Sequence, residues 1–209
     1  MGIGEGTIVN QGAEIVLDNI EENVIGPMTA PCDLTEGYEG SDIGKNCIIG
    51  NNVVIRNDVH IGDNSVIAHQ TIIEPNTWIG NATTVQVFSA FASDTKIGNN
   101  CFIGPYFSTT NCFVQPVGPK GRHPNKIQGK LESLRIGNDV SIGANVCVIP
   151  GIIIGNNVEI GMNTFIKADV PSGESPENPF KIKGGSVWTK KDLFSYNEHK
   201  KHIPLVDLK

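Results

Sequence analysis

The chain has 209 residues, enough for one domain with a sizeable hydrophobic core. Its net charge of −6 argues against a general nucleic-acid-binding surface, and no segment approaches the ~20 apolar residues of a membrane span. Aromatic residues make up only 6% while the chain has 24 glycines, which favours short strands joined by tight turns over a helical bundle. The N-terminus has no basic start and no apolar signal core, so we expect a cytoplasmic protein.

Residues 1–42 are predicted to form a partial coil followed by a cap. Residues 3–20 read IGEGTI, VNQGAE and IVLDNI, which fit a six-residue pattern that becomes regular further along the chain. Residues 21–42 break this pattern and predict an irregular excursion.

A six-residue repeat runs from Ile43 to residue 114 and resumes over 136–171, giving eighteen hexads such as IGKNCI and IGNNVV. The first position is Ile, Val or Phe in 17 of the 18, the exception being Thr109. Neither an α-helix nor a single strand buries every sixth residue. The pattern therefore predicts a coil of short strands with a corner after each, three hexads to a coil.

The fourth hexad position predicts the conformation of the corner. It is Asn or Asp in 12 of the 18 hexads, as in Asn46 and Asn145, and these residues tolerate a left-handed backbone. The fifth position is small or β-branched, as in Cys47 and Thr71, which suits a narrow interior between stacked coils. We therefore predict an all-β fold in which a parallel β-helix spans residues 43–171.

Residues 115–135 (QPVGPKGRHPNKIQGKLESLR) interrupt the repeat as an inserted loop. The loop carries five basic residues, among them Lys120 and Arg122, against a single Glu. On an acidic protein this predicts contact with an anionic group, such as the phosphates of CoA or of a sugar nucleotide. A solvated flexible loop is the alternative.

Residues 172–209 are predicted to form a C-terminal extension that leaves the solenoid. Within it, 189–201 (TKKDLFSYNEHKK) predicts a short helix, with Thr189 as its cap and Asp192 in its first turn. The closing IPLVDLK resembles the opening of sugar-nucleotide aminotransferases of the aspartate aminotransferase superfamily. This resemblance implies fusion to, or partnership with, such an aminotransferase.

The [Ile/Val]-Gly-x-x-x-x hexads resemble those of the hexapeptide-repeat acyltransferases. The resemblance implies a left-handed parallel β-helix and a homotrimer that binds acetyl-CoA between neighbouring subunits. Residues 140–171 resemble the CoA-binding coils of that family. The expected contacts with the pantetheine chain are Gly143, Ala144, Gly161 and Met162, and those with the phosphates are Lys167 and Lys183. As an alternative, the small residues only relieve crowding at the corners.

The hexads before the loop, IGPYFSTTNCFVQP, resemble the 3-amino-sugar N-acetyltransferases, which carry Thr-Asn-Asp there. Thr110 and Asn111 match, whereas Cys112 replaces the Asp. The stretch lacks the His that many O-acetyltransferases use as a base, and an amine needs orientation more than deprotonation. The resemblance implies N-acetylation of a UDP- or dTDP-linked amino sugar. Asn111 would orient the amine, and Thr110, Lys120 and Arg122 would bind the substrate.

Two histidines compete for the role of a catalytic base. His69 lies at a coil corner and His123 lies in the basic loop, and for both the alternative is a solvated surface residue. Three rival functions stay open: an O-acetyltransferase of a sugar or other hydroxyl, a zinc-dependent γ-class carbonic anhydrase, and a non-enzymatic scaffold. No metal is expected, since the spacing of the histidines does not resemble that of the anhydrase family.

Overall fold

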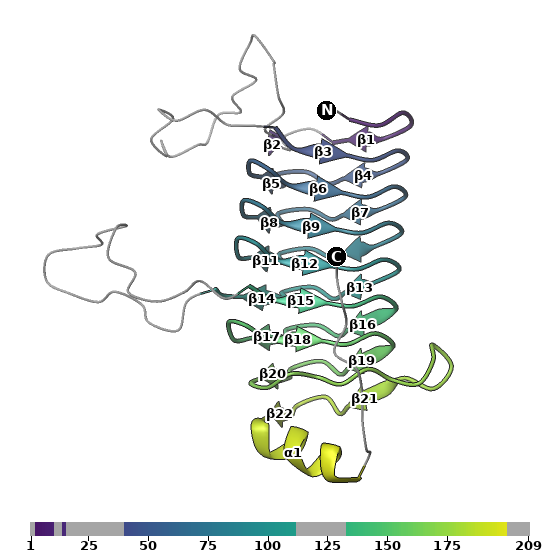
Figure 1. Cartoon of the computed structure of the whole chain (residues 1–209). Coiled ribbons are helices and arrows are strands. Elements are labelled where there is room, and N and C mark those ends of the chain that lie inside the picture. Colours follow the sequence, from purple (N-terminus) through teal and green to yellow (C-terminus); the bar gives the residue numbers. More distant parts are fainter. Residues whose placement is uncertain (1–2, 11–13, 16–39, 112–132, 200–209) are drawn as a thin grey trace, which may run out of the picture.

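The computed structural model describes residues 3–10, 14–15, 40–111 and 133–199, which wind into a three-sided parallel β-solenoid (Figure 1). Strands three apart in sequence pair in parallel up to β20, so each coil there adds one strand to each of three sheets, as Ile49 beside Ile67 illustrates. The predicted all-β parallel β-helix is confirmed, and β1 and β2 show that the coil begins before residue 43.

Each sheet forms one side of the prism. The first sheet consists of β1 (Ile8–Val9), β4 (Ile48–Ile49), β7 (Val66–Ile67), β10 (Thr84–Val85), β13 (Phe102–Ile103), β16 (Val140–Ile142), β19 (Val158–Ile160) and β21 (Phe180–Ile182). The second sheet consists of β2 (Glu14–Ile15), β5 (Val54–Ile55), β8 (Ile72–Ile73), β11 (Ala90–Phe91), β14 (Ser108–Thr109), β17 (Cys147–Val148), β20 (Phe165–Ile166) and β22 (Val187–Trp188). The third sheet consists of β3 (Asp42–Ile43), β6 (His60–Ile61), β9 (Trp78–Ile79), β12 (Lys96–Ile97), β15 (Arg135–Ile136) and β18 (Ile153–Ile154).

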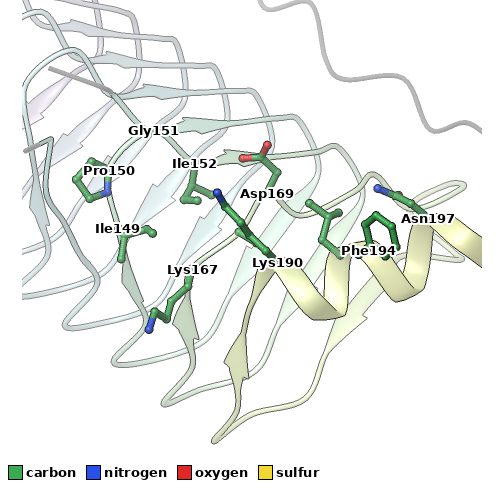
Figure 2. Close-up of a pocket in the computed structure, with 11 residues that line it drawn as sticks. Ile149, Pro150, Gly151, Ile152, Lys167, Asp169, Lys190, Phe194 and Asn197 are labelled. Carbon is green, nitrogen blue, oxygen red and sulfur yellow. The ribbon is translucent and has the colours of Figure 1, made fainter. Parts of the chain in front are cut away.

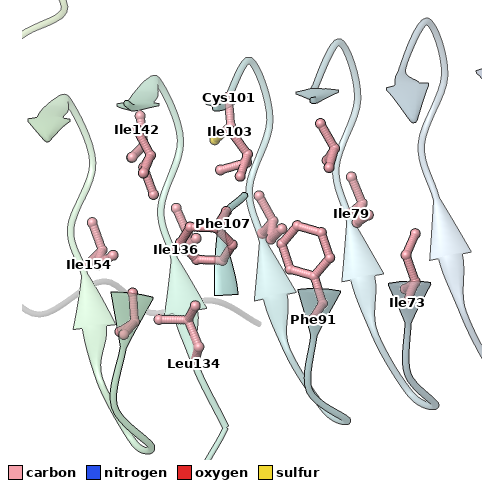
Figure 3. Close-up of a cluster of buried hydrophobic side chains, with 14 of the residues drawn as sticks. Ile73, Ile79, Phe91, Cys101, Ile103, Phe107, Leu134, Ile136, Ile142 and Ile154 are labelled. Carbon is pink, nitrogen blue, oxygen red and sulfur yellow. The ribbon is translucent and has the colours of Figure 1, made fainter. Parts of the chain in front are cut away.

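The interior is filled by the first and fifth positions of the hexads (Figure 3). First-position isoleucines such as Ile61 and Ile79 are fully buried and stack coil upon coil. Fifth-position hydroxyls and thiols are buried too, but they donate hydrogen bonds to carbonyls: Ser65 Oγ donates to Gly80 O at 3.0 Å and Cys101 Sγ to Gly137 O at 3.1 Å. No buried side-chain nitrogen or oxygen among the described residues lacks a partner, so a hydrogen bond offsets the desolvation of each of these polar groups.

The fourth hexad position has the predicted left-handed backbone. Its φ is positive at every described hexad from Asn46 (55°) to Tyr106 (60°), and again from Asp139 to Asn163, with Gly151 included. Asp169 is the exception, and its carboxylate accepts a hydrogen bond from Ile153 N–H at 2.9 Å. The corners are thus set by local backbone preference, and the apolar positions are set by burial.

The sheets continue beyond residue 171, where we expected the chain to leave the solenoid. Strands β21 and β22 pair onto β19 and β20, after a short excursion in which Ser175 and Asn178 form an antiparallel bridge. The predicted C-terminal helix is confirmed as α1 (Lys190–His199). Asp192 accepts hydrogen bonds from the Thr189 hydroxyl at 2.5 Å and from its N–H at 2.8 Å, which lowers the pKa of Asp192 and caps the helix.

The edge between the third and first sheets carries a ladder of side chains; we call it the ladder edge. From Lys45 to Asn156, the third-position N–H of each corner donates to the side-chain oxygen of the third-position residue one coil further on. The rungs are Lys45 to Asp63 (2.7 Å), Asp63 to Asn81 (2.7 Å), Asn81 to Asn99 (2.8 Å), Asn99 to Asn138 (2.7 Å), Asn138 to Asn156 (2.7 Å) and Asn156 to Ser172 (3.0 Å). The ladder satisfies the third-position amides of this edge from Lys45 to Asn156.

Replacing Asn99 by Ala should lower the free energy of unfolding by about 1 kcal/mol, because the N–H of Asn81 loses its acceptor. Replacing Asn99 by Asp is the matched control, since Asp63 forms the same rung with a carboxylate oxygen. Equilibrium unfolding in urea measures both changes. Equal losses for the two variants would mean that the rung contributes nothing.

Candidate functional site

The edge between the first and second sheets differs from the ladder edge; we call it the uncharged edge. Its third and fourth corner positions, 51–52, 69–70, 87–88, 105–106, 144–145, 162–163 and 184–185, include no Asp, Glu, Lys or Arg. Lys183 precedes the last of these corners and is exposed. By contrast, the ladder edge carries Lys45, Asp63 and Asp139 at the same positions. An uncharged strip suits the neutral part of a ligand.

The amides of the uncharged edge are not covered by a ladder. Among the described residues this edge has a single rung, in which Asn51 N–H donates to His69 Nδ1 at 2.6 Å. Further along, the residue opposite Ala144 is Met162, whose thioether is at most a weak acceptor, and no described group accepts a hydrogen bond from Ala144 N–H. Ala144 therefore exposes a backbone N–H at the surface. On the ladder edge, the corresponding N–H groups donate to side-chain oxygens.

Gly143, Ala144, Gly161, Met162 and Lys183, five of the six predicted cofactor residues, lie together on this edge. Packing between coils also requires glycine at two of these positions. A Cβ on Gly143 would stand 2.5 Å from Met162 N, and one on Gly161 would stand 2.2 Å from Gly184 N. The N–H of Gly161 donates to Ile182 O at 2.9 Å. Of the two amides considered for stabilising an oxyanion, only that of Ala144 is available.

His69 lies on the same edge, three coils before Ala144, roughly 14 Å away at the spacing of adjacent strands. Because Nδ1 accepts the Asn51 N–H, the neutral ring carries its proton on Nε2. In this tautomer His69 has no free nitrogen with which to take a proton. His69 thus accepts a corner N–H, as the Asn and Asp side chains do on the ladder edge.

The third edge, between the second and third sheets, runs beside the C-terminal helix; we call it the helix edge. Thr110 and Asn111 occupy the second and third positions of one of its corners, the last described before residues 112–132. One coil further on, the strands on either side of this edge are β17 and β18. Lys167, the sixth predicted cofactor residue, lies two coils beyond Thr110 on the helix edge and not with the other five.

A cavity of about 430 Å³ lies between the helix edge and α1 (Figure 2). Its walls come from two corners of the solenoid and from one side of the helix: Ile149, Pro150, Gly151, Ile152, Lys167, Ala168, Asp169, Lys190, Leu193, Phe194 and Asn197. Figure 2 shows the side chains of Lys190 and Phe194 reaching from α1 over this space. Two lysines and an aromatic ring around one cavity are groups that can bind an anion and a flat ring.

Between the uncharged edge and the helix edge lies the outer face of the second sheet. Its outward positions carry no charge along the described strands after β2: Val54, Ile72, Ala90, Ser108, Cys147, Phe165 and Val187. The third sheet, in contrast, presents Asp42, Lys96 and Arg135 outward. The face of the second sheet separates Asn111 from Ala144 within one chain.

Three predicted site residues, His123, Arg122 and Lys120, lie outside the described residues, as does Cys112. Two other cysteines are interior groups: burial raises the pKa of the Cys101 thiol to about 11 and also raises that of Cys47. Over the same described ranges there is no cluster of three or more His, Cys, Asp or Glu that could hold a metal ion, and α1 is too short and too polar to cross a membrane.

Two stretches of the chain, residues 40–75 and 133–168, match the family of bacterial transferase hexapeptide repeats (six repeats). These stretches coincide with regular coils on both sides of the insertion. The hexapeptide repeats of this chain therefore resemble those of bacterial transferases. No curated protein matched this chain in a sequence search.

Solved structures similar to this hexapeptide-repeat protein include a mutant of perosamine N-acetyltransferase from Caulobacter crescentus in complex with CoA and GDP-perosamine. It is 17% identical, with 63% of this chain and 47% of that chain covered and a TM-score of 0.34. AntD, an N-acyltransferase from Bacillus cereus in complex with dTDP and coenzyme A, is 20% identical, with 70% and 82% covered and a TM-score of 0.41. LpxA from Acinetobacter baumannii is 22% identical, with 71% and 62% covered and a TM-score of 0.42. This chain spans about half the length of the first of these structures.

Sequence reasoning missed what distinguishes the three edges of this hexapeptide-repeat protein. The hexads of the three edges look alike. The ladder edge differs from the uncharged edge at the third corner position, which recurs every eighteenth residue and holds Asp63, Asn81 and Asn99 on the ladder edge. Reading the sequence in columns of three hexads would have found this signal. It would also have placed Lys167 on a different edge from Gly161.

Proposed function

We propose that this protein is an acetyl-CoA-dependent N-acetyltransferase that acts on the amino group of a UDP- or dTDP-linked amino sugar. The observation that carries the proposal is the uncharged edge, where Ala144 N–H is left without an acceptor among the described residues. Pantetheine is a neutral chain of amides, and it requires a neutral track with exposed backbone donors. Gly143 and Gly161 permit its close approach, and Lys183 follows at the end of the track for a phosphate.

The proposed reaction is a direct transfer in a ternary complex. The amine nitrogen attacks the thioester carbonyl, a C–N bond forms, and the C–S bond breaks. The amine proton passes to the departing CoA thiolate. Ala144 N–H would donate to the oxyanion, and Asn111 Oδ1 would accept a hydrogen bond from the amine and hold it in line. No acyl-enzyme is needed.

A second copy of the chain completes this site in our proposal. Asn111 and Ala144 lie on different edges of one prism, separated by the face of the second sheet, so one chain does not bring them together. Beyond β2 that face is uncharged and largely apolar, which suits burial between copies. In a closed trimer, the uncharged edge of one subunit would meet the helix edge of its neighbour.

The hydroxyl of a sugar is the alternative acceptor. It would need a base, and the hydrogen bond that His69 Nδ1 accepts from Asn51 N–H argues against that residue. His123 keeps this alternative open, since it lies outside the described residues. The cytoplasmic location, the absence of a metal and the partnership with an aminotransferase stay predictions.

The test is thiol release from acetyl-CoA with a panel of UDP- and dTDP-linked sugars that carry an amine at C3 or C4. We expect one of them to be acetylated, as seen by mass spectrometry, and we expect Asn111→Ala to lower kcat/KM about 100-fold through loss of orientation. Asn57→Ala is the matched control, because Asn57 holds the same corner position three coils earlier on the helix edge. No thiol release with any amine would sink the proposal, and a loss equal in both variants would remove Asn111 from it.

A further inference from the structure

Two corners of the uncharged edge are occupied by aromatic residues in an unfavourable backbone conformation. Phe88 and Tyr106 have φ angles of 59° and 60°. The other described residues in this column are Asn52, Gln70, Asn145, Asn163 and Gly185. A bulky side chain in the left-handed region is strained, whereas Asn and Gly adopt it readily.

Burial does not account for the strain. Phe88 is 44% exposed and Tyr106 is 55% exposed, so neither ring belongs to the core. The two rings stack on each other with centroids 5.1 Å apart and planes 7° apart. Strain that packing does not require is characteristic of binding sites.

The pair lies next to the proposed thioester site on the same edge. Asn145 N–H donates to Pro105 O at 2.8 Å, which places the corner of Tyr106 one coil from that of Ala144. Phe88 lies one coil further away, and its own N–H donates to His69 O at 3.2 Å. Along the column, amide side chains stand on both sides of the pair, Gln70 before Phe88 and Asn145 after Tyr106.

We propose that Phe88 and Tyr106 bind the nucleobase of the acceptor; this inference rests on the proposed function and names its nucleotide subsite. A pyrimidine base is flat, neutral and edged with amide-like donors and acceptors. Aromatic rings pack against such a base, and Gln70 and Asn145 supply groups that pair with its edge. These corners carry no charged side chain, so they do not suit the phosphates of CoA. With the base two coils from Ala144, an extended nucleotide-linked sugar places its amine toward the thioester.

The alternative occupant of these rings is a second copy of the chain, since exposed aromatic residues are common at subunit contacts. The two occupants predict different results. Nucleotide affinity falls without a change in native mass if the rings bind a base. Native mass falls if they join subunits.

The experiment compares Phe88→Asn and Tyr106→Asn with Ala82→Asn as the matched control. Ala82 has a φ of 52° at the same hexad position but lies on the ladder edge. We expect all three variants to raise Tm by about 2–4 °C, because Asn relieves the backbone strain. Titration calorimetry with UDP and dTDP should show at least ~10-fold weaker binding for the two aromatic variants and no change for Ala82→Asn. CoA affinity and native mass should stay the same.

Unchanged nucleotide affinity in both aromatic variants would overturn the inference, as would absence of nucleotide binding by the wild-type protein. Loss of native mass would assign the rings to a subunit contact and overturn it as well. The proposed function is judged separately by turnover of the wild-type protein. Turnover with unchanged nucleotide affinity in the variants removes only the inference. Weakened nucleotide affinity without wild-type turnover removes only the acetyltransferase proposal.

Discussion

A mixture of two inactive variants, Asn111→Ala and Ala144→Phe, should recover about a quarter of the wild-type activity when the two chains are co-expressed. Each variant damages one edge of the prism, the helix edge in the first and the uncharged edge in the second. If a site is built from two chains, random pairing leaves about one site in four with both edges intact. Thiol release by the purified mixed oligomer measures the recovery.

Ala144→Phe is chosen because the third corner position of the uncharged edge tolerates large side chains. His69 and Met162 occupy it in other coils, so the fold should survive the change while the pantetheine track is blocked. Asn51→Phe is the matched control at the same position near the N-terminal end, and it should leave activity unchanged. Each variant alone should fall about 100-fold below wild type.

Failure of the mixture to recover activity would contradict a shared site. The comparison needs the masses of both variants to match that of wild type, so that loss of assembly is separated from loss of the site. Recovery above half of wild type would contradict random pairing of two edges. An inactive mixture would mean that both substrates bind within one chain.

The repeat of the sequence was sufficient to predict the strands, and the reason is physical. A buried Ile at every sixth position and a residue tolerant of positive φ three positions later fix both the strand and the corner, as in Ile61 and Asn64. The strands within residues 172–188 were not predicted, because the hexad phase is shifted there. A four-residue excursion precedes β21, so Val158 pairs with Phe180 and not with residue 176.

The candidate site was less predictable than the fold, because its residues are grouped by edge and not by sequence motif. Gly161 and Lys167 are six residues apart, yet they lie on two different edges. Asn99 accepts a hydrogen bond from the N–H of Asn81 one coil earlier, whereas Met162 leaves the N–H of Ala144 without an acceptor. A single hexad does not contain this difference. The aromatic residues at 88 and 106 departed from the hexad pattern, and such departures mark the places where the fold alone does not dictate the residue.

Phe107→Ala should cost the protein about 3–5 kcal/mol of unfolding free energy, the largest stability loss we expect from a single truncation. Phe107 occupies a fifth hexad position, which in most other hexads holds a small or β-branched residue, and its side chain is fully buried. Its ring packs against Phe91 with centroids 5.4 Å apart (Figure 3). The following first position is Thr109, smaller than the usual Ile and only half-buried. We infer that the Phe107 ring fills the volume that Thr109 leaves.

Phe102→Ala is the matched control for this truncation. Phe102 lies five residues earlier in the same coil, but its side chain points outward and is 43% exposed. Its loss should change the unfolding free energy by about 0.5 kcal/mol or less, and urea titration separates the two cases. Equal losses would mean that the interior at this coil is loosely packed. Because Phe107 lies four residues before Asn111, a tightly packed ring there would also hold the corner that carries the proposed catalytic residue.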